Sequence, residues 1–115
     1  DVCSSDLEGF SKENTCAHIA IPPTGRSLYA ANRGHDSLAC FALDASGRMT
    51  SLGQQPTEKV PTHFATDAAG RFLYAAGQGG DRLASYQVDP ASGRLSPLDA
   101  YTVGTNPYWV LPVSP

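Results

Sequence analysis

The chain has 115 residues, of which 41% are apolar and 17% charged, and its formal net charge at pH 7 is −3. This weak negative charge excludes the basic footprint of a protein that binds nucleic acid or an anionic membrane. No apolar stretch is long enough to cross a bilayer as a helix, and no secretory apolar segment stands near the start. The bulk numbers therefore predict a globular protein with no nucleic-acid partner and no membrane partner.

The first seven residues have a composition of their own. The string DVCSSDL resembles the translation of a widely used sequencing-adapter oligonucleotide. We therefore interpret residues 1–7 as an assembly scar that is disordered, and we exclude them from the fold. The alternative is a natural N-terminal arm, since chain termini are often loose.

The remainder of the chain repeats itself at an interval of 45 residues. The string GRSLYAA at 25–31 returns as GRFLYAA at 70–76, and DSLA at 36–39 returns as DRLA at 81–84. A third copy opens at Pro107, which corresponds to Pro61. A period of this length is typical of four-stranded propeller blades. One such unit cannot bury its own apolar face, so each repeat needs neighbours.

The elements expected along the chain are all short strands separated by Gly- and Pro-containing turns. Polar residues 8–16 predict a loop. The first blade, about 17–55, contains strands near 17–21, 27–31, 37–43 and 49–54. The second blade, about 62–102, contains strands near 62–67, 71–76, 82–88 and 95–101, and a closing strand occupies about 107–113. No window shows a helical apolar stripe, so residues 8–115 are predicted to be an all-β propeller fragment: two four-stranded antiparallel blades plus the inner strand of a third.

Two blades and one strand cannot close a ring, because propellers need about four to eight blades. We therefore expect this chain to be the C-terminal part of a longer protein. Its partners would include the missing N-terminal blades of the same protein.

The cysteines and histidines predict no metal site. Cys3, Cys16 and Cys40 form no C-x-x-C pair, and the three histidines have no ligand spacing. Cys40 falls in an apolar strand and is expected to be a buried free thiol. An odd, sparse cysteine count favours a reducing compartment, and hence a cytoplasmic location.

Four segments together carry a family resemblance: EGFSKENTCAHIAI, PTGRSLYAANRGHDSLACF, PTEKVPTHFATDAAGRFLYAAGQ and YTVGTNPYWV. They resemble the lactonase family of seven-bladed β-propellers, whose members include 6-phosphogluconolactonases. The resemblance covers residues 8–115 and matches the last two blades and the final strand. It implies that the full-length protein hydrolyses a sugar lactone, 6-phosphogluconolactone to 6-phosphogluconate in the pentose phosphate pathway, and that the fragment alone is inactive. The alternatives are a muconate-lactonising or cyclase-type relative, a non-catalytic ligand-binding propeller and a scaffolding protein.

The site is expected on the face that carries the polar loops. In a propeller the first strand of each blade lines the channel, and the loop between the second and third strands lies at the same end. A lactonase needs a base, donors for the developing oxyanion, and a cation for the phosphate or carboxylate of the substrate. We expect Arg33 to bind the anion or oxyanion, since its planar fork holds oxygens bidentately. His18 or His63 is the candidate base.

The neighbouring loop residues Asn32, His35 and Gln78 are candidate substrate contacts. No cofactor is expected, because a lactone ring is already activated towards water. Bland alternatives remain open: Arg33 as a solvated loop cation, and the two histidines as products of duplication alone. His18 stands where the family usually has an acidic residue, and Thr62 where it usually has Arg. These departures leave altered substrate preference or loss of activity as further possibilities.

Overall fold

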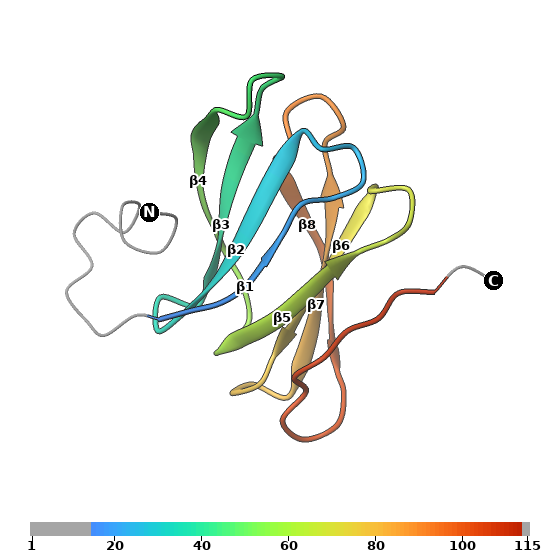
Figure 1. The fold of residues 1–115 in the computed structure, drawn as a ribbon. Helices are drawn as coiled ribbons and strands as arrows, with labels where there is room; N and C mark the ends of the chain where they lie inside the picture. The colour runs from blue at the N-terminus through green and yellow to red at the C-terminus, as the bar shows by residue number, and fades with distance from the viewer. Residues whose placement is uncertain (1–14, 114–115) are drawn as a thin grey trace.

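Residues 15–113, which the computed structural model describes, form two four-stranded antiparallel sheets and no helix (Figure 1). Each sheet is a meander, with strand orders β1-β2-β3-β4 and β5-β6-β7-β8. The predicted all-β fold is confirmed, whereas the predicted scar at 1–7 lies outside the described residues. The strands are β1 (Thr15–Ala20), β2 (Ser27–Arg33), β3 (Ser37–Leu43), β4 (Met49–Pro56), β5 (Pro61–Thr66), β6 (Phe72–Gly77), β7 (Arg82–Val88) and β8 (Leu95–Thr102).

The two sheets repeat each other in register as well as in sequence. Ala30 lies opposite Ala39 in the first sheet, and Ala75 lies opposite Ala84 in the second. Each residue of the second pair lies 45 positions after its counterpart in the first pair, as the repeat predicts. The inner pair of strands in each sheet also has a register shift, between Cys16 and Ile19 in one and between Pro61 and His63 in the other. The repeat is therefore a structural unit.

The sheets pack face to face, and strand alternation decides which side chains lie between them. From β2 the residues on this face are Tyr29 and Ala31, and from β6 they are Leu73 and Ala75. Between the sheets, β5 lies against β1 and β2. The complete buried cluster is Tyr29, Ala31, Leu38, Cys40, Phe64, Leu73, Ala75, Ala84, Tyr86, Val88 and Leu95.

The opposite face of the first sheet carries a second buried cluster: Leu28, Ala30, Ala39 and Phe41. Adding 45 to these positions gives Leu73, Ala75, Ala84 and Tyr86, the residues with which the second sheet meets the first. This face of the first sheet thus has the composition of a surface that packs against a preceding blade. The same sequence pattern therefore occurs on the covered face of the second sheet and on the outer face of the first.

Cys40 is a free and buried cysteine, as expected. Burial raises the pKa of its thiol to about 11, so the group stays protonated near neutral pH. It acts as a small apolar side chain in the cluster between the sheets.

The segment expected as a closing strand, 107–113, is not a strand in the structure. A strand is defined by its ladder of hydrogen bonds to a neighbour. Every strand within residues 15–113 already belongs to one of the two complete meanders. Residues 107–113 lie beyond the second sheet with no partner strand, and in Figure 1 the segment runs past β5 and away from the sheets.

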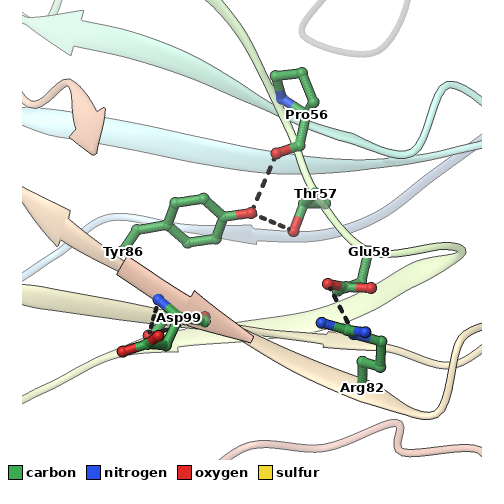
Figure 2. Close-up of polar contacts among 7 residues, drawn as sticks. Pro56, Thr57, Glu58, Arg82, Tyr86 and Asp99 are labelled. Carbon is green, nitrogen blue, oxygen red and sulfur yellow. Dashed lines mark hydrogen bonds and ion pairs between the residues drawn. The ribbon is translucent and has the colours of Figure 1, made fainter. Parts of the chain in front are cut away.

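Two tyrosine hydroxyls tie the blades together across the apolar interface. The fully buried Tyr29 on β2 donates to the carbonyl of Gly93, in the β7–β8 hairpin. The Tyr86 hydroxyl on β7 donates to the Pro56 carbonyl at 3.1 Å and also hydrogen-bonds the Thr57 hydroxyl, with 2.7 Å between the two oxygens (Figure 2). Nearby, Arg82 pairs with Glu58 at 3.4 Å. Each bond joins one repeat to the next, so these contacts fix the distance and angle between neighbouring blades.

Replacing Tyr29 with Phe should destabilise the protein by about 1–2 kcal/mol, because the buried Gly93 carbonyl loses its donor. Thermal unfolding of the longer protein that carries this chain measures the effect. The matched control is Thr50→Val, which removes a hydroxyl from the exposed strand β4 and should change stability by less than about 0.5 kcal/mol. Equal stabilities for the two variants would show that the Tyr29 hydroxyl does not hold the blades together.

Candidate functional site

The predicted site residues gather at one end of the two blades. The β2–β3 turn, the β6–β7 turn and the first residues of β1 and β5 all lie at the lower end of Figure 1. The four Gly-containing turns that close the other connections lie at the upper end. Loops carried on a rigid sheet commonly supply function, so the lower end is the candidate site.

An aspartate in each β2–β3-type turn holds the loop that leads into the next inner strand. The Asp36 carboxylate accepts the N–H of Val60 at 3.0 Å, and its carbonyl accepts the N–H of Thr57 at 3.0 Å. We call this arrangement the aspartate clamp. It holds Val60, the residue directly before β5. The clamp thereby fixes the start of the strand that carries His63.

The clamp is repeated at the end of the second blade. The Asp81 carboxylate accepts the N–H of Asn106 at 2.9 Å, and its carbonyl accepts the N–H of Val103 at 3.0 Å. Asp36 and Asp81 both have φ 56, while Val60 and Asn106 have φ 52 and 53. Positive φ is costly for a β-branched residue such as Val60. The same backbone geometry at both junctions shows that 107–110 occupies the place of an inner strand, although it has no strand partner.

The clamps bring three side chains into one stack. His18, His63 and Trp109 hold the same repeat position on three successive inner segments. The ring centroids of His18 and His63 are 4.3 Å apart, and those of His63 and Trp109 are 4.1 Å apart, with the last two rings nearly parallel at 15°. We call these three residues the aromatic stack. The structure thus brings both predicted histidines into contact.

His63 is the buried member of the stack, with only 6% of its surface exposed. Its Nδ1 accepts the N–H of Val110 at 3.0 Å. Burial, reinforced by the neighbouring His18, lowers the pKa of His63 below its ordinary value. The ring is therefore neutral at neutral pH.

His18 is half-buried on β1 and contacts the edge of Phe64 as well as His63, with centroids 4.9 Å apart for the Phe64 pair. Burial lowers the pKa of His18 below its ordinary value. A neutral imidazole that solvent can still reach is suited to accept a proton.

Arg33 ends β2 and pairs across the ladder with Thr15, at the start of β1. One guanidinium nitrogen donates to the Cys16 carbonyl at 3.4 Å, while its Nε is buried with no hydrogen-bond partner. Cys16 precedes His18 by two residues on β1, so the cation contacts the strand that carries His18. Because this Nε is buried, an anion could bind only through the terminal guanidinium nitrogens.

The three predicted substrate contacts differ in accessibility. Asn32 is 1% exposed, and its amide donates to the Ser37 hydroxyl at 3.4 Å, so it supports the β2–β3 turn. His35 Nδ1 lies 2.7 Å from the same hydroxyl. Gln78 is half-buried, and its backbone N–H donates to the Val60 carbonyl at 3.1 Å. A role in substrate binding stays a prediction for all three.

Sequence reasoning missed the aspartate clamps and the participation of residues 109 and 110. The signal was present in both cases. Asp36 and Asp81 are equivalent in the repeat, and Trp109 follows Pro107 as His63 follows Pro61. The sequence does not show, however, which atoms these residues contact.

Residues 15–113 contain no cluster of three His, Cys, Asp or Glu side chains that could hold a metal ion.

Over the same part of the chain, no helix is long and apolar enough to span a membrane.

Comparison with known proteins decides the family. The model of the family described as "Lactonase, 7-bladed beta-propeller" matches residues 1–112. The chain belongs to this lactonase family. The described sheets are therefore two blades of a propeller.

Relatives named 6-phosphogluconolactonase are similar over most of the chain. The protein of Erwinia tasmaniensis is 39% identical over 105 residues, which cover 90% of this chain and 32% of that protein. The protein of Sodalis glossinidius is 44% identical over 103 residues, covering 89% and 31%. The chain thus spans about a third of the length of these curated relatives.

Solved structures agree with the fold. A Lactobacillus plantarum protein has a TM-score of 0.78 at 33% identity and covers 85% of this chain and 29% of its own. The periplasmic gluconolactonase of Pseudomonas aeruginosa also has a TM-score of 0.78, at 32% identity, with coverages of 85% and 28%.

The aspartate clamp should depend on the acceptor oxygen and not on the charge. Replacing Asp36 with Ala removes the acceptor for Val60 and places Ala at a positive φ, so it should destabilise the protein by about 2–3 kcal/mol. Asp36→Asn is the matched control, because Asn keeps an acceptor oxygen and tolerates this φ. Thermal unfolding and exchange of the Val60 amide measure both effects. Slow amide exchange at Val60 in the Ala variant would contradict the clamp.

Proposed function

We propose that the longer protein carrying this chain hydrolyses a lactone, by attack of water on the ring ester. The observation that supports the proposal best is the contact between two histidines on adjacent inner strands of a lactonase-family propeller. Neutral imidazole near pH 7 is the group best suited to remove a proton from water.

The residues of this chain supply a proton acceptor and a cation. The His18–His63 pair provides the proton acceptor, in which one ring takes a proton from the attacking water. Arg33 attracts the anionic part of the substrate or the oxyanion that develops on the carbonyl oxygen. Its guanidinium is held against the Cys16 carbonyl, two residues from His18. Collapse of the tetrahedral intermediate breaks the ring C–O bond and leaves a carboxylate and a hydroxyl.

We further propose 6-phosphogluconolactone as the substrate and 6-phosphogluconate as the product, as in the pentose phosphate pathway. Two observations support this choice. Relatives up to 44% identical carry the name 6-phosphogluconolactonase, and Arg33 offers the planar fork that suits a phosphate. We place the reaction in the cytoplasm because the sugar phosphate is an intracellular metabolite class. Secretion of the full-length protein into the periplasm would overturn that location.

Arg33→Ala in the full-length protein should lower kcat/KM for 6-phosphogluconolactone on the order of tenfold to a hundredfold, because the anion loses its bidentate partner. A coupled assay for 6-phosphogluconate measures the rate. Arg48→Ala is the matched control: Arg48 is an exposed arginine in the hairpin between β3 and β4, at the opposite end of the blade. An unchanged kcat/KM in the Arg33 variant would remove Arg33 from the site.

The same assay decides between catalysis and binding. Release of 6-phosphogluconate at rates above the uncatalysed background supports a lactonase. Binding of the sugar phosphate without turnover would favour a ligand-binding propeller. The 115-residue chain alone should be inactive, because two blades form only part of a channel wall.

A further inference from the structure

The two histidines of the aromatic stack differ in what their ring nitrogens do. His63 Nδ1 accepts the Val110 N–H at 3.0 Å, so this nitrogen carries a lone pair and not a proton. In a neutral imidazole the proton must then sit on Nε2. His18 meets its described neighbours through ring contacts, with His63 at 4.3 Å and Phe64 at 4.9 Å between centroids.

We propose that the histidines have separate roles, an inference that rests on the proposed function. His18 is the catalytic base. His63 is a positioning residue: the Val110 N–H fixes its tautomer, Trp109 holds one face of its ring, and the His18 ring rests against it.

His63 cannot accept a proton without losing its place. Its Nδ1 lone pair is already used by Val110, and its Nε2 already bears a proton. Protonation at Nδ1 would set two N–H donors against each other and break the contact with the segment at 107–110. The ring is also 6% exposed, which leaves little room for a substrate or water.

His18 has the opposite properties. Its side chain is half-buried, so water and substrate can approach it. Burial lowers its pKa, so the ring is unprotonated near neutral pH.

During hydrolysis His18 first accepts a proton and then returns it. An unprotonated nitrogen of His18 takes one proton from water as the water oxygen bonds to the lactone carbonyl carbon, and the carbonyl electron pair becomes an oxyanion. The oxyanion then reforms the carbonyl while the ring C–O bond breaks. The leaving alkoxide takes the proton from the His18 imidazolium, and the new carboxylic acid ionises to solvent.

The charged surroundings of His18 are simple within the described residues. β1 carries no Asp, Glu, Lys or Arg, and on β5 the only titratable side chain is His63. Phe64, the other ring in contact, is apolar. From β2, Arg33 reaches the β1 backbone at Cys16 and disfavours a second positive charge nearby. The pH dependence of hydrolysis should therefore report on His18.

Kinetics of the full-length protein test the base. In the parent, kcat/KM should rise with pH through the pKa of His18, which burial lowers below its ordinary value, and then level off. His18→Gln should lower kcat/KM on the order of a hundredfold and abolish this acidic limb. His18→Glu should move the limb to about pH 4–5, the range of a carboxylate. His63→Gln, whose side-chain carbonyl keeps an acceptor for the Val110 N–H but cannot titrate, should lower the rate yet leave the limb in place. A limb that disappears in His63→Gln and persists in His18→Gln would overturn the proposal.

The tautomer of His63 can be measured without any activity. In the full-length protein labelled with ¹⁵N at histidine, the His63 signals are assigned by their loss in His63→Gln. We expect Nδ1 to be unprotonated and Nε2 protonated at pH 7. Val110→Pro removes the N–H donor and should free the tautomer, whereas Val110→Ala, the matched control, should not. A protonated Nδ1 in the parent would overturn the positioning role. Absence of lactone hydrolysis would remove the proposed function, while this spectrum would still decide the fixed tautomer.

Discussion

The structure depends on one constraint: the apolar faces that the two sheets turn toward each other are buried only by their contact. Tyr29 and Ala31 from the first blade and Leu73 and Ala75 from the second exclude water only when the sheets lie face to face. Apolar area removed from water is the main stabilising contribution in such a repeat array. The polar ties at Tyr29, Tyr86 and the aspartate clamps add direction to that packing, because hydrogen bonds are directional and apolar contacts are not.

The same packing builds the candidate site. Close approach of the sheets brings β1 against β5, and His18 and Phe64 meet across that contact. The clamps then fix where each inner segment starts, so that equivalent residues of neighbouring segments lie side by side and their rings can stack. A site made in this way belongs to no single blade. Its geometry is a property of the junctions between blades.

The fold could be predicted from the sequence because the pattern of each strand occurs in both copies of the repeat, so each copy supports the assignment of the other. The strand at 37–43 and its copy at 82–88 were predicted with the bounds that the structure has. The segment 107–113 was not, because strand pairing depends on a neighbour that its own residues do not supply. The contact of His18 with His63 followed only in part from their equivalence in the repeat. The hydrogen bond from the Val110 N–H to His63 could not be predicted, because every residue except proline carries a backbone N–H and the residue type therefore does not reveal the donor.

Val60 has a further consequence for how the chain can change over time. Its side chain leans on Gly79, where an added methyl group would come within 2.8 Å of a Val60 methyl carbon. The strained backbone at 60 and the absent side chain at 79 therefore form one size constraint shared by two distant positions. Substitutions at these two positions should therefore be correlated. A larger residue at 79 becomes tolerable once Val60 is replaced by a small residue that readily adopts positive φ. Sequence drift at either position alone should be rare among proteins that keep this junction.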